Sequence, residues 1–190
     1  TCAVEAADSD QLELTDIVYV WKAFGESEET LGEGSSIDLS EHEVRPETEI
    51  VCEVTVTDAQ SATATDSVSV TLDNRVPSFT VSPSLSGDPA FTSGPEINTV
   101  LTCTSESNDP DGDPLTVSTA WTLDGQPVFN DQPTVDLLLE TVSVGSEIQC
   151  EVTITDEFGG EATESTSVTV ANTMPQFVGH LINPSSPVYA

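Results

Sequence analysis

The sequence predicts an all-β fold made of antiparallel β-sandwiches, and two observations support this prediction. First, apolar and polar residues alternate with a period of two in several segments rich in Val, Ile and Thr. Such alternation is typical of half-buried antiparallel strands. Second, one pattern of about 100 residues occurs twice, and this is the size of one sandwich domain. No segment has a convincing helical period, and one helical turn at most is expected, in 40–48.

The duplication appears as residues that recur at nearly constant spacing. Around the second cysteine of each copy, IVCEVTVTD and IQCEVTITD agree at seven of nine positions. We therefore expect two copies of one domain in tandem. The recurring pairs are Cys2 and Cys103, Trp21 and Trp121, Cys52 and Cys150, and Pro77 and Pro175, at offsets of 101, 100, 98 and 98.

The predicted strands follow the same order in both copies. A strand that carries the tryptophan comes first, a strand that carries the second cysteine follows, and a short turn leads to a third alternating strand. In the first copy the inward residues are Ile17, Tyr19 and Trp21, the strand 50–58 precedes a turn at 58–61, and Val68, Val70 and Leu72 follow. In the second copy the inward residues are Val117, Thr119 and Trp121. The strand 148–156 precedes a turn at 156–160, and Val168 and Val170 follow.

The charge of the chain excludes two classes of partner. Its 34 acidic residues outweigh 3 basic ones, so the formal net charge is −31. Lys22, Arg45 and Arg75 are too few to form a basic groove for nucleic acid. They are also too few for binding to anionic lipid. Since no apolar run reaches the roughly 18 residues of a membrane span, direct membrane insertion is not expected.

Four cysteines allow three disulfide pairings, and the residues alone do not choose among them. The cysteines are tens of residues apart, and His42 and His180 are the only histidines, so a zinc site is not indicated. Disulfides are favoured instead, and these form in an oxidising extracellular or periplasmic compartment. The chain begins at Thr1, and we interpret it as a processed protein or an excised segment.

The spacing of cysteine, tryptophan and cysteine is similar to that of immunoglobulin-like (Ig-like) sandwiches. The last strands of both copies resemble polycystic-kidney-disease (PKD)-type modules of bacterial surface proteins. This resemblance implies a disulfide between the two sheets of each domain, a tryptophan packed against it, and a prokaryotic cell-surface or extracellular location. The implied pairs are Cys2–Cys52 and Cys103–Cys150, and the implied core residues are Trp21 and Trp121. Exposed tryptophans that bind carbohydrate are the alternative.

The two copies differ from the family pattern. Ile50 and Ile148 occupy the position of the family's corner tyrosine, and the glycine-rich WDFGDG signature is replaced in 21–26 and 121–126.

The domain boundaries predicted from the duplication are uneven. Residues 75–172 form a complete Ig-like domain whose first strand is 76–83, whereas residues 1–74 lack their own first strand. Residues 173–190 read as a linker plus the first strand of a following domain or subunit, because MPQFVGHLINP in 174–184 aligns with VPSFTVSP. Either the chain is a window from a longer array, or 174–190 of one copy completes the next copy by strand addition.

An acidic loop at 108–114 suggests a calcium site, because its carboxylates alternate around a glycine and calcium binds several oxygens. The linker 73–77 and the turn at Asp156 are expected at the same pole of the second domain. The Asp-Asn-x-x-Pro run is similar to the cadherin linker, where calcium stiffens the joint. The expected ligands are Asp73, Asn74, Asp109, Asp111, Asp113 and Asp156. Alternatively, these residues only form turns.

No catalytic motif occurs, and no enzyme activity is expected. The function that these features favour is a structural segment of an extracellular repetitive fibre, stalk or surface adhesin. Its Ig-like units would join head to tail, by strand complementation in one interpretation, and its partners would be further copies or adjacent Ig-like repeats. The alternative is a calcium-dependent adhesion domain, or a carbohydrate-binding or spacer module of a secreted enzyme.

Overall fold

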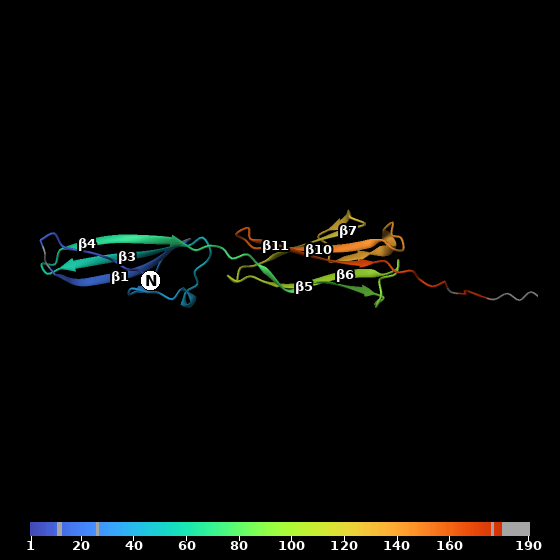
Figure 1. Cartoon of the computed structure of the whole chain (residues 1–190), viewed down its shortest axis with the longest axis horizontal. Coiled ribbons are helices and arrows are strands. Elements are labelled where there is room, and N and C mark those ends of the chain that lie inside the picture. Colours follow the sequence, from blue (N-terminus) through green and yellow to red (C-terminus); the bar gives the residue numbers. More distant parts are fainter. Residues whose placement is uncertain (11–12, 26, 176, 180–190) are drawn as a thin grey trace, which may run out of the picture. The chain divides into compact units, whose positions relative to one another are not determined.

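The structure is a computed structural model that describes residues 1–10, 13–25, 27–175 and 177–179. Within these residues it forms strands and two short 3₁₀ turns (Figure 1). The strands are β1 (Leu14–Phe24), β2 (Glu28–Glu33), β3 (Glu49–Asp58), β4 (Thr63–Thr71), β5 (Ser78–Asp88), β6 (Val100–Asn108), β7 (Thr116–Leu123), β8 (Gln126–Asn130), β9 (Thr134–Asp136), β10 (Glu147–Thr155) and β11 (Glu161–Thr169). The 3₁₀ turns are η1 (Leu39–Glu41) and η2 (Leu137–Leu139).

The chain divides into two compact units. The first contains Thr1–Ser78 together with the loops Ser107–Thr116 and Ile154–Ala162. The second contains Phe79–Glu106, Val117–Thr153 and Thr163–Ala190. We call the sandwich around β1–β4 the first sandwich and the one around β5–β11 the second sandwich.

The first sandwich is built on an antiparallel sheet with the strand order β2-β1-β3-β4. Trp21 on β1 lies opposite Cys52 on β3, and Cys52 lies opposite Val68 on β4. Alternate residues of β3 face the core, since Ile50, Cys52 and Val54 are 2%, 1% and 6% exposed. The period-two pattern of the sequence therefore becomes one buried and one solvated sheet face.

The second sandwich has two sheets. One has the order β11-β10-β7-β8, and the other has the order β5-β6-β9. A disulfide between Cys103 on β6 and Cys150 on β10 links the two sheets, and Cys2–Cys52 is the equivalent bond of the first sandwich. The predicted fold of tandem Ig-like antiparallel sandwiches, and both disulfide pairs, are thus confirmed. The core of the second sandwich consists of Leu101, Cys103, Trp121, Val135, Leu137, Ile148, Cys150, Val152, Ile154 and Val170.

The two sandwiches repeat individual hydrogen bonds. The backbone N–H of Cys2 donates to Ser35 O at 2.8 Å, and that of Cys103 donates to Pro133 O at 2.9 Å. In both sheets the register shifts at the residue after the tryptophan. Asp38 caps η1 and Asp136 caps η2, at the same offset of 98 that separates the second cysteines. In the parts that both sandwiches contain, the sequence duplication is therefore accompanied by matching backbone bonds and caps.

The first strand of the second sandwich is β5, which begins two residues after the predicted start and extends to Asp88. Its order in the sheet makes β5 an edge strand, where Pro83 is tolerated because an edge strand has one side without ladder bonds. Two residues expected to face inward are partly exposed, Ile17 by 43% and Val117 by 55%. Ile17 lies opposite Val56, four pairs along the ladder from the disulfide-bonded Cys52.

The first sandwich lacks a counterpart of the β5-β6-β9 sheet within the described residues. The segment around Cys2 occupies the place of β6 but is not part of a strand. At the other end, residues 171–175 and 177–179 belong to no strand. The rest of the predicted final strand, 180–190, lies outside the described residues. None of the described helical segments is long and apolar enough to cross a membrane.

Candidate functional site

The linker that follows β4 is held against two loops by side-chain bonds. Asn74 Nδ2 donates to Asp156 Oδ2 at 2.9 Å. The next residue, Arg75, donates its backbone N–H to Asp111 Oδ2 at 2.8 Å and its Nε to Asp111 Oδ1 at 2.7 Å. Asp73 is exposed and lies outside the cluster of Asp109, Asp111 and Asp113. The linker path is therefore set by Asn74 and Arg75.

The loop after β6 folds around the carboxylate of Asp109. Its Oδ1 accepts the backbone N–H of Asp111 at 2.7 Å and of Asp113 at 3.3 Å, which closes an Asx-type turn. Gly112 has φ +80°, a left-handed conformation that glycine adopts without strain. One carboxylate oxygen from each of Asp109, Asp111 and Asp113 lies within 4.8 Å of the other two. The loop thus gathers three carboxylates at one point.

Among the described residues of this loop and of the linker, three oxygens are buried without a hydrogen-bond partner. They are Oδ2 of Asp109, Oδ2 of Asp113 and Oδ1 of Asn74. Asp109 is 5% exposed and Asp113 is 8% exposed. A buried acceptor without a partner costs about 1–3 kcal/mol, and a charged one costs more. These are the hard oxygen donors that calcium and magnesium bind.

Asp156 has both of its oxygens occupied. Oδ1 accepts the backbone N–H of Phe158 at 2.9 Å and of Gly160 at 2.7 Å, and Oδ2 accepts the bond from Asn74. The bond from Asn74 is the main reason why the pKa of Asp156 lies below its ordinary value, and the turn N–H groups add to it against the opposing effect of burial. Asp58 forms the same turn in the first sandwich. Asp156 is therefore a turn former that also anchors the linker.

Two arginines take part in the site, although no sequence motif assigns them a role there. Arg75 pairs with Asp111, and this hydrogen bond is the largest cause that lowers the pKa of Asp111. Arg45 pairs with Asp113 Oδ1 at 3.2 Å and with Glu157, and its guanidinium lies 5.5 Å from the ring centre of Phe158. One sequence signal sets Arg45 and Arg75 apart: the chain has only three basic residues, and these are two of them.

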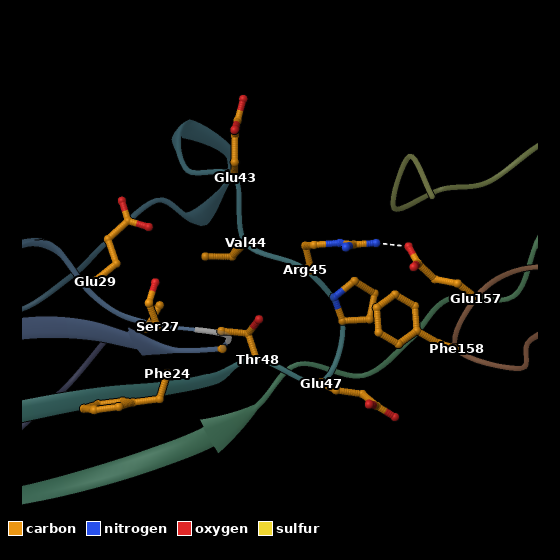
Figure 2. A pocket seen from close by; sticks show the side chains of 13 residues that line it. Phe24, Ser27, Glu29, Glu43, Val44, Arg45, Glu47, Thr48, Glu157 and Phe158 are labelled. Carbon is orange, nitrogen blue, oxygen red and sulfur yellow. Dashed lines mark ion pairs between the residues drawn. The ribbon is translucent and has the colours of Figure 1, made fainter. Parts of the chain in front are cut away.

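Arg45 also lines an open pocket of about 630 Å³ within the first unit. Figure 2 shows the Arg45 side chain extended toward Glu157, with Phe158 beside it. Glu29, Glu43 and Glu47 border the same pocket. Because carboxylates outnumber the single guanidinium, the pocket is suited to cations rather than to anions.

A second, apolar depression of about 290 Å³ lies on the first sandwich, and we call it the β4 groove. Val68 and Val70 of β4 border it and are 62% and 60% exposed, although they face the same side of β4 as the buried core of the sheet. No lining residue has a charged side chain. The lining residues are Thr1, Cys2, Trp21, Ile37, Leu39, Ile50, Cys52, Val68, Ser69 and Val70.

The two tryptophans lie in the cores. Trp21 is 7% exposed and Trp121 is fully buried. The indole N–H of Trp21 donates to Gly34 O at 2.8 Å, and that of Trp121 donates to Gln132 O at the same distance. Since both indoles are buried and both N–H groups are bonded inside the protein, these residues do not form flat platforms for sugars.

Comparison with known proteins does not assign this chain to a family. No protein-family model matches the chain. A search of curated proteins finds no match either. A solved structure of CbhA fibronectin(III)-like modules from Clostridium thermocellum aligns over 95% of this chain and 88% of that chain, with 11% identity and a TM-score of 0.32. A score of this size does not establish a common fold, so the fold assignment rests on the sheets and disulfides above.

Proposed function

We propose that the chain is a structural segment of a secreted, repetitive fibre, stalk or surface adhesin. In this function Ig-like units follow one another head to tail, and one unit completes the next by adding a strand. The two formed disulfides support an oxidising extracellular or cell-surface location of the prokaryotic type that the PKD-like resemblance implies. The repeated bonds of the two sandwiches support a modular, structural role.

The observation that carries this proposal is the fixed linker. In a flexible string of domains, the linker residues would be solvated and mobile. Here Asn74 and Arg75 are bonded through side chain and backbone to Asp156 and Asp111. A linker bonded in this way is less free than the solvated linker of a flexible string, as we expect of a segment in a stalk or fibre.

The buried oxygens favour a more specific form of this proposal, in which calcium binds where the linker meets the loop 108–114. A divalent cation at the clustered carboxylates would satisfy the unpartnered oxygens of Asp109 and Asp113, and Asn74 in the linker offers a third unpartnered oxygen. It would also link the linker to the loop more firmly than the hydrogen bonds alone. Asp111 is held by Arg75 and contributes to the cation through charge or a shared oxygen. Asp73 and Asp156 have no direct role as ligands in this arrangement.

Calcium titration tests the joint. The melting temperature of the chain is measured with EDTA and with rising calcium, and binding heat is measured by calorimetry. We expect stabilisation, by about 2.7 kcal/mol when calcium reaches 100 times its Kd. Asp109→Asn retains an oxygen for the turn and replaces the unpartnered oxygen with an amide, so it should lose the response.

Asp58→Asn is the matched control, because Asp58 closes the equivalent kind of turn in the first sandwich and its turn bonds are exposed to solvent. This variant should respond to calcium as the unchanged chain does. An absence of heat and of any melting shift at millimolar calcium would remove calcium from the proposal. Electron microscopy of the native surface material tests the wider function, and globular particles in place of filaments or stalks would contradict it.

A further inference from the structure

Two arginines pair with the same cluster of carboxylates, Asp109, Asp111 and Asp113. Arg75 donates from Nε to Asp111 Oδ1 at 2.7 Å, and Arg45 donates from Nη2 to Asp113 Oδ1 at 3.2 Å. Both pairs lie within the first unit. The chain has 34 acidic residues and only 3 basic ones, yet two of the three meet at this cluster. Their guanidinium groups offset two of its three negative charges.

The repeated fold does not require a base at either position. Ser143 and Thr173 are the counterparts of Arg45 and Arg75, 98 positions on, and the second sandwich has its buried core and its disulfide without them. The side chains of Arg45 and Arg75 are 54% and 64% exposed. Ion pairs of such exposed groups contribute little to stability. The two arginines therefore have a local effect on the cluster rather than a general one on the fold.

Arg45 and a bound cation would share the carboxylate of Asp113. Its Oδ1 accepts the bond from Arg45, whereas its Oδ2 is, in the part of the chain that the structure describes, buried without a hydrogen-bond partner. Oδ2 of Asp109 is in the same state. A divalent cation that binds these two oxygens would lie close to the guanidinium group. The two positive charges repel each other, and burial of both carboxylates limits the screening by water.

Arg75 restricts the carboxylate of Asp111 in a similar way. It donates its backbone N–H to Oδ2 and its Nε to Oδ1, so both oxygens are occupied. Its Nη2 also donates to Pro110 O at 2.6 Å. Asp111 can bind a cation only if it shares an oxygen with Arg75 or releases the Nε. Each arginine thus opposes the cation at a different carboxylate.

We propose that Arg45 and Arg75 compete with the divalent cation and lower its affinity for the joint. The charge of the ligand set tunes calcium affinity, and extracellular modules bind with a Kd of about 10⁻⁴–10⁻³ M. A bound cation must in turn weaken the bond from Arg45 to Asp113, because coupling between two ligands is reciprocal. Arg45 then keeps its contacts with Glu157 and Phe158 (Figure 2).

This competition gives the joint two states. The arginines neutralise the carboxylates where calcium is scarce, and calcium replaces part of this neutralisation where it is abundant. The cation would therefore load the joint in calcium-rich surroundings such as those outside a cell. The inference rests on the calcium joint proposed above and adds the regulation of that site.

Calcium titration by calorimetry at constant ionic strength tests the competition in the full chain. We expect Arg45→Gln to bind calcium about fivefold more tightly than the unchanged chain, because one nearby positive charge is removed. Arg75→Gln should act in the same direction. Arg45→Lys keeps the charge and should bind within about twofold of the unchanged chain. In the unchanged chain, the NMR signal of the Arg45 Nε–H group should shift as calcium is added.

Lys22→Gln is the matched control, because it removes the same charge from the same chain. Lys22 pairs with Glu28 and Glu53, which lie outside the cluster. This variant should bind calcium as the unchanged chain does, and circular dichroism checks that each variant is folded. Equal tightening in Lys22→Gln would assign the effect to net charge and overturn the inference.

The remaining outcomes separate this inference from the function on which it rests. Unchanged or weaker binding by Arg45→Gln or Arg75→Gln would overturn the competing role of that arginine, and weaker binding would make it a positioning residue for the carboxylates. Calcium binding by the arginine variants alone would support the competition in its strongest form. Absence of binding in every variant would overturn the inference and the calcium joint together, while electron microscopy still tests the fibre or stalk.

Discussion

Asn74 and Asp156 are 82 positions apart in the sequence and share a hydrogen bond of 2.9 Å from Nδ2 to Oδ2. The other oxygen of Asp156 closes the turn that follows β10, through the backbone N–H groups of Phe158 and Gly160. One carboxylate thus connects a turn with the linker. Any change that alters this turn is therefore expected to alter the path of the linker.

Replacement of Gly160 by alanine should break this connection. A Cβ at Gly160 would lie 2.3 Å from Asp156 Oδ2 and 2.8 Å from Asn74 Nδ2. One of the two side chains must move, and overpacking of this kind costs about 1–3 kcal/mol. We expect Gly160→Ala to lower the unfolding free energy by that amount and to increase amide exchange in the linker. Denaturant unfolding and hydrogen exchange measure the two effects.

Gly25→Ala is a suitable control for this substitution. Its added Cβ would meet Thr48 Oγ1 at 3.5 Å, an ordinary van der Waals contact, and its φ is not in the left-handed region. The control should leave linker exchange unchanged. The first sandwich has Ala62 at the position equivalent to Gly160, so this kind of turn accepts a Cβ there. The expected cost at Gly160 comes from the close contacts with Asp156 Oδ2 and Asn74 Nδ2, which are hydrogen-bonded to each other. Equal exchange in both variants would contradict the steric argument.

The pH dependence of stability should reveal the charged state of Asp156. Its folded-state pKa lies below the ordinary value, mainly because of the bond from Asn74. A lowered pKa means that the ionised group stabilises the fold above the unfolded-state pKa of about 3.9, and that this stabilisation is lost as the pH falls toward the folded-state value. Asp156→Asn should therefore melt with a weaker pH dependence between about pH 5 and 2.

Carboxyl titration by NMR separates this effect from those of other acids. Asn74→Ala removes the first cause of the shift and leaves the turn bonds in place. The Asp156 resonance should then titrate at a higher pH than in the unchanged chain. A titration at or above the ordinary value in the unchanged chain would be incompatible with the bond that joins Asn74 to Asp156.

The fold was predictable from the sequence because its signals are local or repeated. Alternation in 50–58 becomes the buried and solvated faces of β3, and the Cys–Trp–Cys spacing matches the disulfides and the buried tryptophans. Two details follow from contacts that no local pattern contains. Ile17 and Val117 follow the alternation but are 43% and 55% exposed, because alternation selects a face of the sheet and does not state what packs against it.

The candidate site was predictable only in outline. The loop 108–114 contains carboxylates at the right spacing, and Asp109, Asp111 and Asp113 do cluster. Whether a given carboxylate oxygen is hydrogen-bonded or left without a partner depends on residues that are far away in the sequence. Asp156 is saturated by its own turn and by Asn74, and Asp111 by Arg75, whereas Asp109 retains one unpartnered oxygen. A residue list cannot separate these states, because an Asx turn and a cation ligand use the same carboxylate.

Removal of either disulfide should weaken its own sandwich and leave the other nearly unchanged. The two bonds close loops of similar size, with sequence separations of 50 and 47. Their stabilisation is about 4 kcal/mol each on the chain-entropy model. Paired substitutions, Cys2→Ala with Cys52→Ala and Cys103→Ala with Cys150→Ala, isolate the two effects.

Each sandwich has its own buried core, so their contributions should be separable. Hydrogen exchange should show loss of protection in β1, β3 and β4 after the first pair of substitutions, and in β6, β7 and β10 after the second. The first pair should have an additional local effect. The segment before Val4 is held by the disulfide and by the bond from Cys2 to Ser35. Loss of the disulfide should therefore release this segment and widen the β4 groove. Equal loss of protection in both sandwiches after one pair of substitutions would show that they unfold as one cooperative body, which would contradict a modular role.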